Sequence, residues 1–308
     1  MPPTAAQVRR ILGRLRSARR TEQGSLLHVL RGLAETGGGS KALLEAGAVP
    51  ALLELVRSSN GRERKAAAEV ALAVLMQLGK SDQNTLCGPN WKAAMLAANA
   101  LLVVVRQLGS SSADSQLFAA VILGDLCLGD NEAAVAAVQH GAAGYVIEAL
   151  QRPADPDTQQ ALLYALWVLA MAPQAAAGLL QNGAAEAIAS LVLSGRVAEQ
   201  AQPQTAWLLR DLTRGSEVRT RALARTGGIR ALLRLMQHGS LEAAAAAAQA
   251  LDSMLGDAPA VQAVAIAEGA IPALEAYLQA HPDSPEAELS ERLLNLLRTA
   301  QHPKQAQQ

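Results

Sequence analysis

The chain has 308 residues, 27 Lys and Arg against 27 Asp and Glu, and 50% apolar residues, which excludes a disordered protein. The zero net charge argues against a protein that binds nucleic acid over its whole surface. Only 2% of the residues are aromatic, so the composition favours a helical array with thin layers of Ala and Leu.

One short phrase recurs along the chain: a glycine, then a helix with apolar residues at i, i+3, i+4 and i+7. The clear copies are AGAVPALLELV at 46–56, HGAAGYVIEAL at 140–150, NGAAEAIASLV at 182–192, TGGIRALLRLM at 226–236 and EGAIPALEAYL at 268–278. Degenerate copies are VRRILGRLRS at 8–17 and AANALLVVVRQLG at 97–109. After each copy, a polar loop leads into a longer helix. Seven copies at a period of about 42 residues predict a solenoid of stacked repeats.

The first 21 residues carry six arginines and no acid. An Arg-rich amphipathic start is typical of an organelle transit peptide, which is one interpretation. The alternative is a first repeat, because Val8, Ile11, Leu12 and Leu15 repeat the apolar spacing of the later copies. We favour the repeat, since removing it would expose the apolar face of the next one.

The third repeat is irregular, with an insertion at residues 81–94 that includes Cys87 and Trp91. Insertions in solenoids form surface loops, often at a binding face. Trp91 is therefore a candidate contact residue; the alternative is that its ring covers a distorted junction.

The phrases GAVPALL at 47–53, GAIPAL at 269–274 and TAWLLRDL at 205–212 resemble the armadillo repeat family. HEAT repeats are the main rival, but the three-segment unit fits armadillo better. The resemblance implies an all-α, right-handed superhelical solenoid of about seven repeats over residues 1–300, followed by a disordered tail at 301–308. The repeats are expected near 8–34, 38–79, 81–129, 131–172, 173–215, 216–256 and 257–300.

Peptide-binding members of that family carry a ladder of Asn and Trp on the third helices. Here the Asn positions fall on Val74, Asp125, Val168, Asp211, Met254 and Leu296. The Trp positions fall on Val70, Val121, Tyr164, Trp207, Ala250 and Arg292. Only Trp207 with Asp211 matches well, so the resemblance implies that an importin-type role is weakened. Asp in place of Asn predicts a Lys or Arg donor on the partner.

Aromatic residues cluster in the fourth and fifth repeats, namely Tyr145, Tyr164, Trp167 and Trp207. Interfaces are enriched in Tyr, Trp and Arg, so this cluster is a candidate partner site. The alternative is inter-repeat core, because Trp is highly buried on average. The candidate contact residues are Trp207, Asp211, Arg210, Tyr164, Trp167, Asp125 and Trp91.

The charges are segregated into blocks. Residues 196–234 carry eight Arg against three acids, and residues 241–291 carry nine acids and no Lys or Arg. A solvated face explains any single run. Together, the blocks predict charge complementarity with partners, including head-to-tail self-association between a basic amino end and an acidic carboxyl end.

Catalytic motifs are missing from the sequence. No HxxxH, HExxH, CxxC, Walker or GxSxG pattern occurs, and no stretch is a membrane span. The sequence therefore predicts no enzyme, cofactor, metal or small-molecule substrate, and makes nucleic acid a weak candidate. The two cysteines suit a reducing compartment.

The function expected is a non-catalytic scaffold or adaptor that binds a partner peptide or helix along a concave groove. Alternatives are a structural subunit of a ciliary or cytoskeletal assembly, and a nuclear transport adaptor. The cytoplasm is the expected location, with cilium, nucleus or an organelle as alternatives.

Overall fold

A computed structural model describes residues 3–58, 62–80, 89–152, 154–256 and 258–302. All regular secondary structure in those ranges is helical, so the predicted all-α class is confirmed. The tail expected at 301–308 lies outside the described residues from 303 onward, and so does Cys87. The helices group into two compact units, Met1–Tyr145 and Val146–Gln308.

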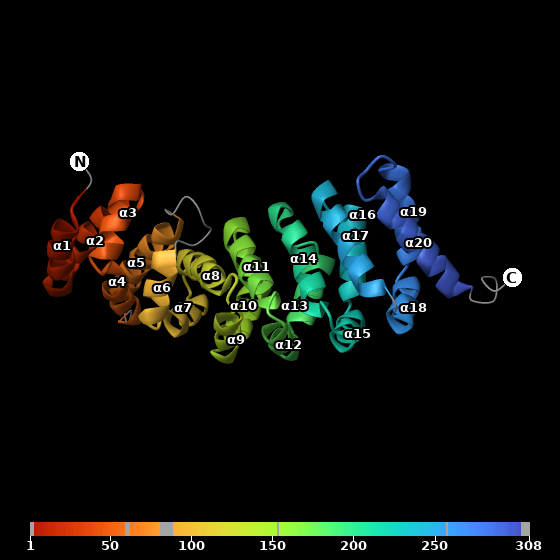
Figure 1. Cartoon of the computed structure of the whole chain (residues 1–308), viewed down its shortest axis with the longest axis horizontal. Helices are drawn as coiled ribbons and strands as arrows, with labels where there is room; N and C mark the ends of the chain where they lie inside the picture. The colour runs from red at the N-terminus through yellow and green to blue at the C-terminus, as the bar shows by residue number, and fades with distance from the viewer. Residues whose placement is uncertain (1–2, 59–61, 81–88, 153, 257, 303–308) are drawn as a thin grey trace. The chain divides into compact units, whose positions relative to one another are not determined.

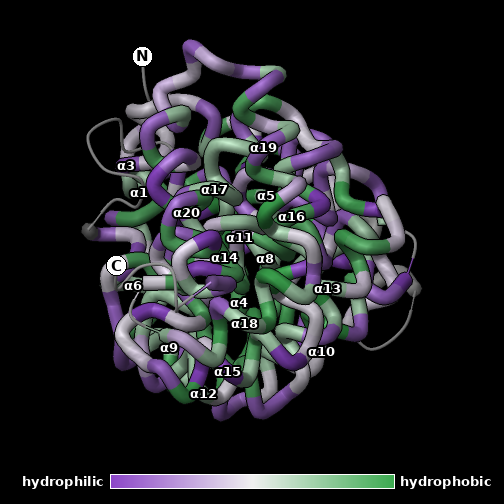
Figure 2. The backbone as a smooth tube through the Cα atoms, turned by 90° about the vertical axis from the view of Figure 1, so that its right-hand side faces the viewer, coloured by the Kyte–Doolittle hydropathy of each residue, from purple (hydrophilic) through white to green (hydrophobic). Residues whose placement is uncertain are grey.

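The first unit is built from helices in repeating order, two in the first repeat and then three per repeat (Figure 1). Its helices are α1 (Ala5–Ser17), α2 (Arg20–Ala34), α3 (Gly37–Glu45), α4 (Ala48–Arg57), α5 (Arg62–Lys80), α6 (Pro89–Ala97), α7 (Ala100–Leu108), α8 (Ala113–Cys127) and α9 (Asn131–Gln139). Helix α10 (Ala142–Gln151) begins at the end of this unit. The backbone carries both hydrophobic and hydrophilic segments (Figure 2), as amphipathic helices require.

The second unit continues the same order. Its helices are α11 (Pro156–Ala170), α12 (Pro173–Gln181), α13 (Ala184–Leu193), the 3-10 turn η1 (Glu199–Ala201), α14 (Gln202–Thr213), α15 (Glu217–Arg225), α16 (Gly228–His238), α17 (Leu241–Leu255), α18 (Pro259–Ala267), α19 (Ala270–Ala280) and α20 (Ala287–Gln301). The third helices α11, α14, α17 and α20 pack against one another in sequence.

A left-handed residue joins the first and second helices of each full repeat. The residues and their φ angles are Gly47 (74°), Asn99 (53°), Gly141 (90°), Gly183 (80°), Gly227 (87°) and Gly269 (84°). Glycine adopts this conformation without the steric cost that a Cβ imposes, which explains why the phrase is marked by glycine. In the degenerate third copy Asn99 takes the same conformation, because asparagine tolerates it better than other residues.

The cores are layers of small and medium side chains. In α17 the buried alanines are Ala243, Ala244, Ala246, Ala247, Ala248 and Ala250. Small side chains let α14 approach α17 closely, and Leu208, Leu209 and Leu212 of α14 are fully buried. Such thin layers need few aromatic rings, in agreement with the composition.

Polar side chains also connect neighbouring repeats through the backbone. Gln159 of α11 donates to the carbonyl of Arg196 at 2.9 Å and accepts from the amide of Ala198 at 2.6 Å. Gln202 has the same role one repeat later, where it accepts a hydrogen bond from the amide of Ser240 at 3.0 Å. Each contact satisfies polar groups of the loop before the next third helix, so the third helices are fixed to their neighbours.

Candidate protein-interaction site

Three aromatic side chains lie together on the adjacent third helices α11 and α14, which run side by side (Figure 1). The ring centroids of Tyr164 and Trp167 are 6.2 Å apart, and those of Trp167 and Trp207 are 5.9 Å apart. Both pairs are tilted, a geometry that aromatic pairs prefer over a face-to-face sandwich. All three side chains are partly exposed. We call Tyr164, Trp167 and Trp207 the aromatic cluster.

A buried carboxylate holds the cluster in place. Asp211 is 2% exposed, and its Oδ2 accepts a hydrogen bond from Nε1 of Trp167 at 3.0 Å. Asp211 lies one turn after Trp207 on α14, whereas Trp167 belongs to the preceding repeat on α11. One carboxylate therefore fixes an indole ring of the neighbouring repeat, and that ring lies tilted against Trp207.

Two arginines form ion pairs with the carboxylate of Asp211. Nε of Arg210 lies 2.9 Å from Oδ1 of Asp211, and Nη2 of Arg214 lies 2.6 Å from the same oxygen. The Arg210 side chain is 24% exposed and that of Arg214 is 57% exposed. Two cations around one buried anion leave a net positive edge beside the aromatic cluster. The site is thus a rigid apolar surface with a cationic border.

The position of Asp211 corrects one expectation from the sequence. We predicted that this carboxylate would accept hydrogen bonds from a partner, but its side chain is 1% exposed and already bonded to Trp167, Arg210 and Arg214. Its role in the structure is to position neighbouring side chains. Of the other predicted residues, Trp167 and Arg210 contact Asp211, and Tyr164 and Trp207 lie against the Trp167 ring.

Trp91 and Asp125 were also predicted as contact residues, and both are buried in the first unit. Trp91 is 0% exposed, and its ring packs over Gly79 of α5, where an added Cβ would be 3.4 Å from the ring atoms. The alternative interpretation, a ring that covers the junction after the insertion, agrees with this packing. Asp125 is 7% exposed in α8. Neither side chain presents the surface that a partner contact needs.

Two residues of the site were not singled out from the sequence. Arg214 was counted only in a basic block, although its i+3 spacing from Asp211 is the signal for an ion pair. Met171 follows the last turn of α11 and is 40% exposed, at helical spacing from Tyr164 and Trp167. Tyr145, grouped with the cluster on sequence, instead packs its ring against Gly109 of α7.

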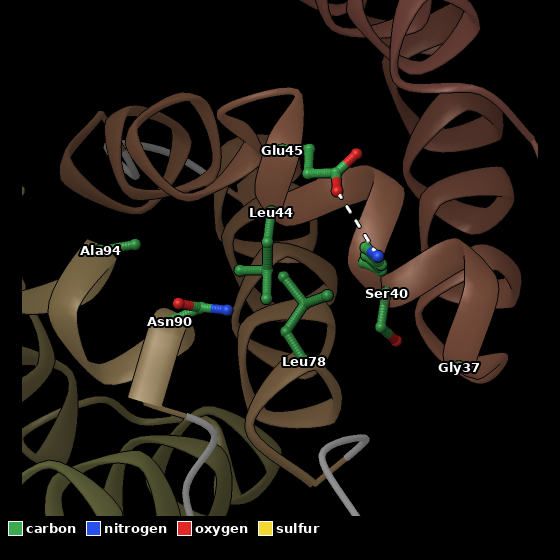
Figure 3. Close-up of a pocket in the computed structure, with 8 residues that line it drawn as sticks. Gly37, Ser40, Leu44, Glu45, Leu78, Asn90 and Ala94 are labelled. Atoms are coloured by element: carbon green, nitrogen blue, oxygen red, sulfur yellow. Dashed lines mark ion pairs between the residues drawn. The ribbon is translucent and has the colours of Figure 1, made fainter.

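A cavity of about 600 Å³ lies in the first unit between α3, α5 and α6 (Figure 3). Leu44 and Leu78 line it beside Asn90, and Lys41 is 4.0 Å from Glu45 at its edge. The lining holds no nucleophile paired with a base, so the cavity offers no catalytic arrangement among the described residues.

Other chemistry is sparse in the described part of the chain. No group of three or more His, Cys, Asp or Glu residues there is placed to hold a metal ion. No single helix in those ranges combines the length and hydropathy needed to cross a bilayer. Burial raises the pKa of the Cys127 thiol to about 12, so this cysteine is a neutral core residue at ordinary pH.

The arrangement of the helices defines an armadillo-like repeat fold, and solved structures agree. An engineered protein from a structural genomics consortium superposes with a TM-score of 0.79 at 22% identity, covering 94% of this chain and 68% of its own. A designed armadillo repeat protein in complex with the peptide (KR)4 gives a TM-score of 0.67 at 19% identity, covering 82% and 98%.

A third similar structure comes from work on a phosphorylation switch that controls the interaction between cadherin and beta-catenin. It gives a TM-score of 0.77 at 16% identity, covering 98% of this chain and 59% of that one. No protein-family model and no curated protein sequence matches the chain. At these identities the comparisons establish the fold.

Proposed function

We propose that this chain is a non-catalytic scaffold that binds a segment of another protein across the aromatic cluster of α11 and α14. The observation that carries the proposal is the pair of partly exposed tryptophans, of which Trp167 is held by the buried Asp211 and contacts Trp207. A surface fixed before binding loses little side-chain entropy when a partner docks. Partly exposed Trp and Tyr beside Arg have the composition of binding hot spots.

The border of the cluster suggests the chemistry of the partner. Arg214 keeps donors free because its side chain is 57% exposed, and Met171 extends the apolar surface. A matching segment would place an apolar side chain over Trp167 and Trp207 and a carboxylate beside Arg214. Two structures of similar fold support peptide binding as the general role. One is a designed armadillo repeat protein in complex with a peptide, and the other comes from work on the interaction between cadherin and beta-catenin.

The test is a binding measurement with a peptide selected from a displayed library of aromatic and acidic sequences. We expect Trp207→Ala to weaken its binding at least tenfold, since truncating a central Trp typically costs about 2 kcal/mol or more. The matched control is Val218→Ala, which removes a side chain that is 76% exposed on α15.

Circular dichroism and urea unfolding verify that both variants are folded. If Trp207→Ala binds every selected peptide as tightly as the unmodified chain, the proposal is wrong. Val218→Ala is expected to bind the peptides as tightly as the unmodified chain, which shows that the weaker binding of Trp207→Ala is local to the aromatic cluster.

A further inference from the structure

A second surface lies away from the aromatic cluster, at the start of α17 and the loop between α19 and α20. An open cavity of about 720 Å³ is lined there by apolar groups, including Leu241, Ala245, Pro282 and Pro285. Leu241 is 59% exposed, which is unusual for a large aliphatic side chain in this chain. In Figure 1 the loop forms one end of the last repeat. We call this surface the acidic pocket.

The charges around the acidic pocket have one sign. Glu242, Asp283 and Glu286 line it, and none of them forms an ion pair with a described residue. His281 also lines the pocket, with its ring 5.1 Å from that of Tyr277. The sequence supplies no Lys or Arg between residues 241 and 291. An apolar floor with unneutralised carboxylates at its edge is complementary to a cationic occupant with apolar stems.

The amino-terminal helix has the opposite character. Val8, Leu12 and Leu15 bury one face of α1, which leaves Arg10 and Arg14 on the opposite face, four residues apart. Both arginines are exposed, and neither forms an ion pair with a described residue. Ala6 and Gly13 lie on the same face, so little bulk separates the helix backbone from a docking surface.

These two surfaces complement one another. Arginine covers apolar surface with its methylene stem while the guanidinium reaches a carboxylate at the edge. Four of the eight arginines of block 196–234 are less available, because Arg210, Arg214, Arg221 and Arg230 are paired with acids. Among the described arginines without an acid partner, Arg10 and Arg14 lie one turn apart on one exposed helix face, and this pair matches the acidic pocket.

We infer that the acidic pocket of one copy binds the α1 face of a second copy, giving head-to-tail self-association. Such a contact is heterologous, so each copy keeps one free surface of each kind and chains grow beyond dimers unless they close into a ring. The aromatic cluster takes no part, and the inference is independent of the proposed function.

The experiment is sedimentation velocity of the full chain and of two charge-reversed variants. Variant T carries Glu242→Lys and Asp283→Lys, and variant H carries Arg10→Glu and Arg14→Glu. We expect the unmodified chain to associate at low salt and to dissociate at about 0.5 M salt, where screening is strong. T alone and H alone should associate at least tenfold more weakly, because each then presents two surfaces of like charge.

Mixing the two variants is the decisive step. The arginines of T face the carboxylates of H, and the new lysines of T face the new glutamates of H, so the mixture should recover association. The matched control reverses two exposed first-turn acids elsewhere, Asp114→Lys and Glu132→Lys, and should behave as the unmodified chain.

Recovery in the mixture also shows that both variants are folded. A chain that stays monomeric at low salt overturns the inference and leaves the acidic pocket to a basic segment of another protein. Association that is unchanged in T and H, or that is not recovered when they are mixed, overturns it as well.

Discussion

At the scale of single residues, Cys127 shows how packing changes the chemistry of a side chain. It is 3% exposed at the end of α8. Burial raises the pKa of the thiol to about 12, while nearby Lys92 lowers it and Asp130 raises it to a smaller extent. The unfolded chain has an ordinary cysteine pKa of about 8.5. Between those two values the folded chain keeps a proton that the unfolded chain has lost.

This difference predicts a loss of stability at alkaline pH. The stability contributed by the neutral thiol is complete below about pH 8.5 and falls by at most about 1.4 kcal/mol for each pH unit above it. By pH 10 the free energy of unfolding should be lower by about 2 kcal/mol from this group. Urea unfolding from pH 7 to 10, with Cys127→Ala as the comparison, measures it.

Both proteins in that comparison carry Cys87→Ser, because residue 87 is outside the described structure. The two pH profiles should diverge above pH 8.5, with the steeper fall in the chain that retains Cys127. Parallel profiles would contradict the assignment. Removing the thiol also leaves a cavity, which lowers the free energy of unfolding at every pH. The readout is therefore the slope of the free energy of unfolding against pH.

Residue-scale exposure is the part of the site that the sequence predicted least well. Helical spacing predicts which residues share a face, but not what lies opposite that face. Trp91 is buried because Gly79, on the helix before the insertion, leaves room for its ring. Asp211 is buried because Trp167, 44 positions earlier, donates to it. Both causes are contacts between distant positions, and spacing along one helix does not reveal them.

At the scale of the elements, Asp211 couples two third helices. Its carboxylate accepts from Trp167 on α11, from Arg210 on its own helix α14 and from Arg214, the residue that follows α14. Removing one partner from a buried network leaves the others with unmet hydrogen-bonding capacity. The arginines still reach water, so most of the cost falls on the indole N–H of Trp167.

We therefore expect Asp211→Ala to lower the free energy of unfolding by about 2 kcal/mol, and Asp211→Asn to lower it less, since the amide oxygen still accepts from Trp167. Urea unfolding followed by circular dichroism measures both. The control is Glu217→Ala, which removes an exposed ion pair with Arg221 and should cost under about 0.5 kcal/mol. Equal effects of Asp211→Ala and Glu217→Ala would refute the network.

The order of the elements was predictable from sequence because each junction is chemically marked. Glycine at the left-handed position and the apolar spacing after it predicted the second helix of most repeats. The third copy was degenerate in sequence because Asn99 replaces the glycine, yet its φ of 53° completes the same junction. The junction needs a residue with left-handed backbone conformation, and glycine is the commonest but not the sole residue that adopts it.

At the scale of the whole molecule, the repeats of the second unit depend on bonds between neighbours. Gln159 and Gln202 occupy related positions, and each satisfies an amide of the loop that belongs to the next repeat. In a stacked array, stability is close to a sum of the terms within repeats and between nearest neighbours. A weakened interface therefore lowers the stability and the cooperativity of unfolding together.

For Gln159→Ala we expect a loss of about 1–3 kcal/mol in the free energy of unfolding, because the amide of Ala198 and the carbonyl of Arg196 lose their partner. The adjacent Gln160→Ala is the control, since Gln160 is partly exposed and forms no hydrogen bond with a described residue. Urea unfolding reports both the midpoint and the slope. Indistinguishable curves for the two variants would contradict the role of Gln159.

The placement of the three tryptophans has a spectroscopic consequence. Trp91 is enclosed in the unit Met1–Tyr145, whereas Trp167 and Trp207 are partly open to solvent in the unit Val146–Gln308. Enclosed indoles emit at shorter wavelength and resist acrylamide, whereas open ones are quenched. The emission of the unmodified chain therefore separates into one component for each unit, and denaturation of the two units can be followed without a label.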